Sequence, residues 1–274
     1  MKKVLLASTA LVMSAGFASA DGHAGVSLGG SAELWVENVG GADTMFMNDV
    51  ELTFSASGES DGGMGFGFDY AFVDGAEDNN EVYISFGGLE LRVGDTDDAL
   101  QKVAGMGDIG FDGLGVDDAA EQARGDGSSD GVLVTYSAGD FSVFLSHNQD
   151  TSDDDVGVGV QAALGDFTIG LGYEDQNAAN GDTVALDLAG SFGAASVALY
   201  YEDSDALGSG YGLELGYNVG DVTVNLAYAD HDNVADAAMG IGFSYDLGGG
   251  ATLKGGVADD GTDTNWDLGV AMSF

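Results

Sequence analysis

The sequence predicts an all-β fold: a transmembrane antiparallel β-barrel of about 16 strands with an inward-folded constriction loop. Three observations support this fold. The chain opens with an export signal, glycine turns recur at nearly constant intervals, and apolar and polar residues alternate between the turns. No apolar run after the signal is long enough for a transmembrane helix, so a chain that spans a bilayer has to close its strands into a barrel.

Residues 1–20 contain the three parts of a secretory signal peptide. Lys2 and Lys3 give the basic start, residues 4–13 give a short apolar run, and residues 18–20 give the small-residue pattern Ala-Ser-Ala. A membrane-anchoring helix needs about 20 apolar residues, which this run does not supply. We therefore expect a signal peptide over residues 1–20 and an outer-membrane β-barrel over residues 21–274.

The chain is strongly acidic. All 47 acids follow the signal while two of the six bases lie inside it, so the net charge of residues 21–274 is 4 − 47 = −43. A nucleic-acid partner is excluded, because neutralising phosphates requires clustered Lys and Arg. Cysteine and proline are both absent. The first absence excludes a disulfide framework, and the second suits long strands in which every N–H needs a partner.

Glycine turns divide the chain into units of similar length. Five of them begin, in steps of 26, 28, 27 and 28 residues, at Gly139, Gly165, Gly193, Gly220 and Gly248. Gly62 and Gly88 are also 26 residues apart, but the interval from Gly88 to Gly139 is 51 residues. Each unit accommodates one strand up, a loop and one strand down, and eight units predict about sixteen strands.

The residues between the turns alternate with period two. Ile169, Leu171 and Tyr173, for example, interleave with Gly170 and Gly172. A soluble β-sandwich shows the same alternation with its apolar face inward. Here the second face is rich in Gly, Ser, Thr and acids, which favours a face that lines water. The last strand alternates up to an aromatic terminus, Phe274, which resembles the signal read by the outer-membrane assembly machinery.

Three segments resemble the general porins of alphaproteobacteria, of the Rhodobacter type. They are ELTFSASGESDGGMGFGFDYAF at 51–72, VLVTYSAGDFSVFLSHNQD at 132–150 and SYDLGGGATLKGGVADD at 244–260, and the ending LGVAMSF adds to them. The resemblance implies a trimeric diffusion channel in the Gram-negative outer membrane, in contact with lipid and lipopolysaccharide. It also implies passage of small hydrophilic solutes and ions, and a third external loop that folds into the barrel and narrows it.

The overlong interval contains the long connection, about residues 96–130, which we expect between the fifth and sixth strands. Long loops in compact folds usually carry function or are disordered. Its apolar residues, such as Leu100, Val103 and Ile109, need a surface to pack on and favour a constriction loop. The glycine-rich stretch at 125–129 keeps a floppy external loop open as the alternative.

The alternation predicts which ionisable residues face the lumen. On the pore wall they are Glu33, Glu51, Asp69, Glu90, Arg92, Asp187, Glu214, Asp246, Lys254 and Asp267. The candidate acidic rim on the constriction loop is Asp108, Asp112, Asp117, Asp118 and Glu121. The resemblance implies a basic cluster on the wall opposite the loop, and only Arg92, with Lys254 behind it, matches that pattern. The acidic excess predicts a cation-selective channel.

No catalytic site is predicted. Ser146 and His147 are adjacent, but neighbours on a strand face opposite sides. No cofactor or metal site is predicted either, although acid clusters and the resemblance keep calcium near the constriction loop open as a hypothesis. The alternative to a channel is a structural or adhesive outer-surface β-protein, or a secreted acidic calcium-binding β-protein.

Overall fold

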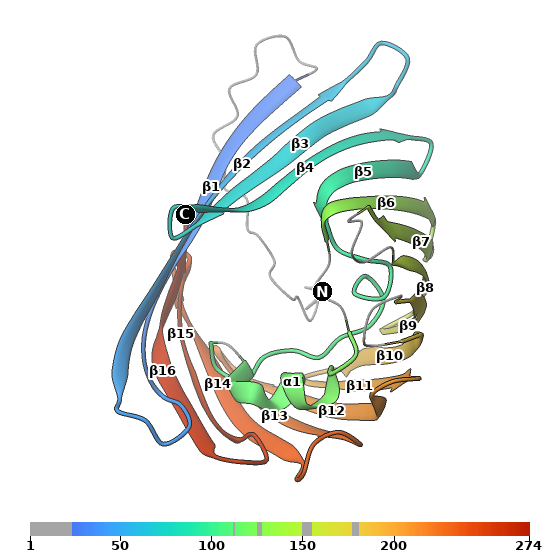
Figure 1. The fold of residues 1–274 in the computed structure, drawn as a ribbon. Helices are drawn as coiled ribbons and strands as arrows, with labels where there is room; N and C mark the ends of the chain where they lie inside the picture. The colour runs from blue at the N-terminus through green and yellow to red at the C-terminus, as the bar shows by residue number, and fades with distance from the viewer. Residues whose placement is uncertain (1–23, 112, 125–127, 150–154, 177–180) are drawn as a thin grey trace.

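A closed antiparallel barrel of sixteen strands makes up most of the molecule (Figure 1). The computed structural model describes residues 24–111, 113–124, 128–149, 155–176 and 181–274. Each strand pairs with its neighbours in the chain, and β1 pairs with β16 to close the ring. The predicted fold class is therefore confirmed. The expected signal peptide over residues 1–20 lies outside the described residues.

The strands have bounds that follow the predicted turns. They are β1 (Ala24–Asn38), β2 (Met45–Glu59), β3 (Gly65–Val73), β4 (Ala76–Phe86), β5 (Leu89–Thr96), β6 (Ser128–Ala138), β7 (Phe141–Asn148), β8 (Val156–Leu164), β9 (Phe167–Asp175), β10 (Thr183–Phe192), β11 (Ala195–Ser204), β12 (Gly208–Val219), β13 (Val222–His231), β14 (Ala238–Gly248), β15 (Ala251–Asp259) and β16 (Thr264–Ser273). Between β5 and β6 lie a single 3₁₀ turn, η1 (Gly113–Gly115), and a short helix, α1 (Val116–Ala120). Within the described residues no helix is long and apolar enough to cross a bilayer.

Two-residue turns join most of the strand pairs at one end of the barrel. Gly139–Asp140 connects β6 to β7 and Gly165–Asp166 connects β8 to β9, as the spacing of the glycines predicts. Gly139 has a φ of +62°, in the left-handed region that a glycine adopts without steric cost. At the opposite end most connections are longer, and the longest joins β5 to β6.

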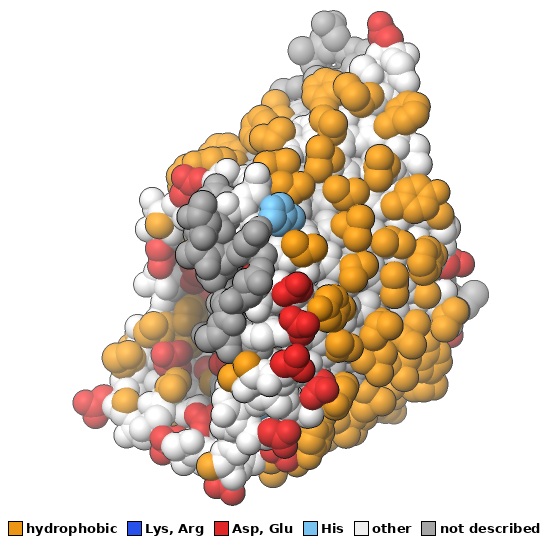
Figure 2. Space-filling model, turned by 45° about the vertical axis from the view of Figure 1, so that its right-hand side comes forward, with side chains coloured by type: hydrophobic (Ala, Val, Ile, Leu, Met, Phe, Trp, Pro, Cys, Tyr) orange, Lys and Arg blue, Asp and Glu red, His pale blue; other side chains and the backbone are white. Residues whose placement is uncertain are grey.

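The outer face of the barrel is apolar. On β9, Ile169, Leu171 and Tyr173 are exposed, while the alternate residues Gly170 and Glu174 are buried on the inner face. Figure 2 shows hydrophobic side chains spread over most of this outer face, with a row of acidic side chains along one edge. An exposed apolar surface of this extent, on strands that form a closed barrel, is the surface that contacts lipid.

The buried core lies inside the barrel. It is formed by the described residues of the connection from β5 to β6, residues 97–124, which we call the inner loop. Buried apolar side chains of this loop, including Leu100, Ile109 and Val116, pack against small residues of the wall such as Ala227 and Ala258. In Figure 1 the loop and α1 run within the ring of strands. The described part of the long connection therefore packs against the wall, and residues 125–127 lie outside the described part.

Glycines on the inner face make room for the loop. A Cβ at Gly170 would lie 1.8 Å from the carbonyl oxygen of Val103, and one at Gly159 would lie 2.5 Å from that of Ala99. These distances are far below van der Waals contact, so no side chain fits at either position. The sequence-based interpretation that the glycine-rich face lines water is wrong at these positions, because the loop covers them.

Candidate functional site: the charged lumen and the inner loop

Wall carboxylates hold the inner loop by its backbone. The N–H of Gly107 donates to Glu214 Oε1 on β12, the N–H of Phe111 donates to Asp267 Oδ2 on β16 over 2.7 Å, and the N–H of Ala123 donates to Glu202 Oε1 on β11 over 3.0 Å. Ionised acceptors make strong hydrogen bonds to backbone N–H groups. Glu214 and Asp267, two of the predicted lumen acids, are therefore hydrogen-bonded to the backbone of the loop.

The apex of the inner loop, by which we mean Phe111 and Leu114, contacts the wall of the barrel. The main contact is made by Phe111. Its ring stacks on Trp35 of β1 with centroids 5.2 Å apart and an interplanar angle of 9°. Lys254 of β15 places its Nζ 4.3 Å from the centre of the Phe111 ring and 3.1 Å from Glu33 Oε1. Glu33 and Lys254, both predicted to line the pore, are therefore paired with each other. The sequence indicates that Phe111, as an apolar residue of the long connection, needs a surface to pack on, but it gives no sign that Trp35 is that surface.

A buried ionisable cluster lies behind the end of the loop. The side chains of Glu202 and His231 are fully buried, with Nε2 of His231 3.3 Å from Glu202 Oε1. The hydroxyl of Tyr200 donates to Glu202 Oε2 over 2.8 Å. The N–H of Asn233 donates to Nδ1 of His231 over 2.9 Å, whereas Nε2 of the same ring lies near Glu202 without a hydrogen-bond partner among the described residues. Both Glu202 and His231 were missed, although the strand alternation places both on the inner face.

The acids of the inner loop differ in exposure. Asp108 and Asp118 are exposed, whereas Asp117, at the start of α1, is partly buried and its Oδ1 has no hydrogen-bond partner among the described residues. Burial, together with the charges of Asp108 and Asp118, raises the pKa of Asp117 to about 7. Glu121 accepts from the N–H of Met106 and pairs with Arg124, and burial raises its pKa. Asp112 lies outside the described residues.

Arg92 is held by three carboxylates on its own side of the lumen. Its guanidinium lies 2.8 Å from Asp69 Oδ2, 2.5 Å from Glu81 Oε2 and 3.2 Å from Glu90 Oε1, and it also covers the ring of Tyr83. The structure brings together three of the predicted wall residues here and adds Glu81, which the sequence interpretation missed. This part of the wall is acidic in spite of its arginine.

The other predicted wall acids lie apart from this cluster. Glu51 of β2 accepts from the hydroxyl of Ser31 over 3.3 Å, and Asp187 is partly buried on the inner face of β10. Asp246 is exposed at the tight-turn end of β14, where it accepts from the N–H of Gly248 over 2.7 Å. These acids do not gather into one site.

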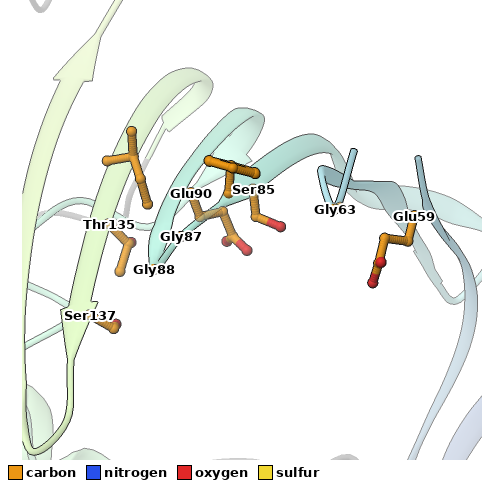
Figure 3. A pocket seen from close by; sticks show the side chains of 11 residues that line it. Glu59, Gly63, Ser85, Gly87, Gly88, Glu90, Thr135 and Ser137 are labelled. Atoms are coloured by element: carbon orange, nitrogen blue, oxygen red, sulfur yellow. The ribbon is translucent and has the colours of Figure 1, made fainter. Parts of the chain in front are cut away.

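A pocket lies at the tight-turn end of β2 to β6. It is lined mainly by polar and glycine residues, together with Phe86 and Leu89. Figure 3 shows Glu59 on one side facing Ser85, Glu90 and Thr135 on the other. The pocket includes Glu90 but none of the inner loop. It belongs to the mouth of the lumen and not to the narrow section beside the loop.

Comparisons with known proteins identify the fold and the family. The family model described as Gram-negative porin matches residues 7–265. The porin of Rhodobacter capsulatus is 30% identical over 301 aligned residues that cover 91% of this chain and 100% of the relative. This chain belongs to the Gram-negative porin family. It is an outer-membrane channel protein, and the alternative of a surface protein without a channel is not favoured.

Two further relatives agree with this assignment. The porin of Fuscovulum blasticum is 27% identical over 270 residues, which cover 86% of this chain and 93% of the relative. A solved mutant of the Rh. blastica porin, at 24% identity, superposes with a TM-score of 0.74 and covers 91% of this chain and 100% of its own. The solved structure supports the fold of this porin.

The relatives of this porin are channels and not enzymes. The pair that could suggest a hydrolase is divided by the wall, because Ser146 Oγ accepts from the N–H of Ala99 inside the barrel and His147 is exposed on the opposite face. Within the described residues no group of three or more His, Asp or Glu side chains is arranged to hold a metal ion. Calcium near the loop stays an untested hypothesis.

Proposed function

We propose that this porin conducts cations in preference to anions, through a passage between the exposed face of the inner loop and the inner faces of β2 to β5. The observation that carries the proposal is the environment of Arg92. Three carboxylates surround this guanidinium, so the one wall base opposite the loop cannot present free positive charge to a passing ion.

The loop side of the proposed passage is acidic as well. Asp108 and Asp118 are exposed, and the ammonium of Lys102 is paired with Asp97. Charges on both sides therefore have the same sign, and a cleft lined by one sign of charge concentrates the counter-ion. In this proposal the inner loop is the constriction, and Asp108, Asp118 and the wall acids Glu51, Asp69 and Glu90 act on ions through their field.

Reversal potentials across a potassium chloride gradient test the selectivity. A lumen potential of about 1 kT enriches cations and depletes anions, which gives a potassium-to-chloride ratio of roughly 7. We expect this ratio near 0.1 M salt and a fall towards roughly 1 at 1 M, because the screening length shrinks from about 10 Å to about 3 Å. Asp166→Asn is the control, because it removes one acid from the turn between β8 and β9, outside the proposed passage. It should keep the wild-type potassium-to-chloride ratio. Equal permeability of chloride and potassium at low salt would contradict the proposal.

The selectivity is expected to depend on pH through Asp117. Because burial raises its pKa to about 7, this carboxyl gains a proton as the pH falls from 8 to 5 and the loop loses one negative charge. The potassium-to-chloride ratio should fall over this range by roughly a factor of two or less, because Asp117 is only one of several acids that contribute to the potential in the passage. The measurement is the reversal potential at fixed salt and varied pH.

Two neighbouring substitutions separate this effect from a general loss of charge. Asp117→Asn should flatten the pH dependence. Asp118→Asn, on the exposed side of α1, should lower the ratio while keeping the dependence, because Asp117 is still present. If Asp117→Asn kept the wild-type pH profile, the titration would belong to other groups.

We further propose that the porin is a homotrimer embedded in lipid and lipopolysaccharide, and that Phe274 is its assembly signal. The trimer is supported by the family resemblance. The N–H of Phe274 donates to the carbonyl of Gly30 over 2.9 Å, while the side chain is 66% exposed. A terminal aromatic ring that is fixed by its backbone but free at its side chain suits recognition by the assembly machinery.

A further inference from the structure

The seam between β1 and β16 differs from every other strand pairing. It joins the two ends of the barrel sequence through eight residue pairs, from Ser31 with Ser273 to Asn38 with Trp266. The neighbouring pairing of β1 with β2 extends over fourteen residue pairs. The other fifteen pairings join strands that follow one another in the chain. Closing the seam therefore costs more chain entropy than any other pairing, because it joins the two ends of the barrel sequence. In return, only eight of the fifteen residues of β1 pair with β16.

The apex of the inner loop contacts both strands of this seam. Phe111 stacks on Trp35 of β1, and its N–H donates to Asp267 of β16. Asn265 of β16 donates its Nδ2 to the carbonyl of Leu114 over 3.3 Å, and it accepts on Oδ1 from the N–H of Gly40 beyond β1. One segment of the loop thus carries contacts to each side of the seam.

A third strand joins the same arrangement. Lys254 on β15 lies over the face of Phe111 and pairs with Glu33 on β1, so the pair spans β16. Phe111 is 8% exposed and is enclosed by an aromatic ring and an ammonium group. Stacked aromatic pairs and cation–π contacts each add stability beyond the apolar area that they bury.

We infer that the loop apex is a brace across the barrel seam, with Phe111 as its central residue and Trp35, Lys254 and Asp267 as its supports. The loop starts between β5 and β6, crosses the interior and fastens the strands that close the ring. Seam closure and placement of the loop in the lumen are then coupled, because the apex has its full binding surface only when β1 and β16 are paired. Phe111 is a positioning residue in this inference.

Hydrogen–deuterium exchange of the folded porin in detergent tests the brace. Phe111→Ala should accelerate exchange of backbone amides in Ser31–Asn38 and Trp266–Ser273 by roughly tenfold, while β8 and β9 keep their protection. Phe111→Tyr keeps the aromatic ring, so the backbone amides of the seam should exchange at the wild-type rate. Val103→Ala is the matched control, because Val103 is also a buried residue of the loop but packs on Gly170 and Gly172 of β9. It should accelerate exchange in β8 and β9 and leave the seam protected.

A second variant keeps the test decisive if Phe111→Ala does not fold. Lys254→Met removes the ammonium and its pairing with Glu33 but keeps much of the side-chain volume, and it should accelerate seam exchange severalfold without loss of the barrel. Unchanged seam exchange in both variants would overturn the inference. Equal acceleration of the seam by Val103→Ala would overturn it as well, because the effect would then belong to loop packing in general.

Discussion

Replacing Gly170 by alanine is expected to lower the single-channel conductance and to destabilise the barrel by about 1–3 kcal/mol. The added Cβ would lie 1.8 Å from the carbonyl oxygen of Val103, so the strand or the loop has to move by more than about 1 Å to reach the 3.0 Å below which Cβ contacts are not found. The wall behind Gly170 is fixed by its pairing with β8 and β10. The loop therefore moves towards the lumen and narrows the passage.

Single-channel recording and urea unfolding measure the two effects. Gly216→Ala is the matched control: Gly216 also faces inward from a wall strand, but its added Cβ meets the side chains of Ser196 and Asn225, which can rotate away. The control should keep the wild-type conductance. If Gly170→Ala kept both conductance and stability, the loop would not lie on β9 in the working channel.

Replacing Glu202 by alanine is expected to be the most destabilising single change in the wall, at about 3–5 kcal/mol. Glu202 is 0% exposed and serves the N–H of Ala123, the hydroxyl of Tyr200 and the imidazole of His231. Removing the carboxylate leaves the N–H of Ala123 and the hydroxyl of Tyr200 buried without their common acceptor, and it removes the charge that faces His231. Each unpaired buried group costs stability.

The midpoint of urea unfolding, followed by loss of the folded band on gels, measures this change. Glu90→Ala is the control, because Glu90 is 34% exposed and Arg92 keeps two other carboxylates. Its cost should not exceed about 1 kcal/mol. Glu202→Gln, which keeps an acceptor oxygen, should fall between the two. A midpoint for Glu202→Ala as high as that for Glu90→Ala would show that the cluster does not support the fold.

The barrel itself could be predicted because its signals are local. A two-residue turn needs a residue with positive φ, so glycines such as Gly139 and Gly165 mark strand ends at the spacing of a hairpin. Period-two alternation then assigns each side chain to one of the two faces. The break in the rhythm between Gly88 and Gly139 located the long connection between β5 and β6.

The roles of the inward-facing residues depended on the tertiary structure. Alternation indicates that Glu214 and Asp267 face inward, but not that the backbone of the inner loop lies against them. It likewise gives no sign that three acids on β3, β4 and β5 surround Arg92. The face of a side chain follows from the backbone geometry of its own strand. Its partner follows from how the inner loop, distant in sequence, crosses the interior, and only the packed barrel fixes that path.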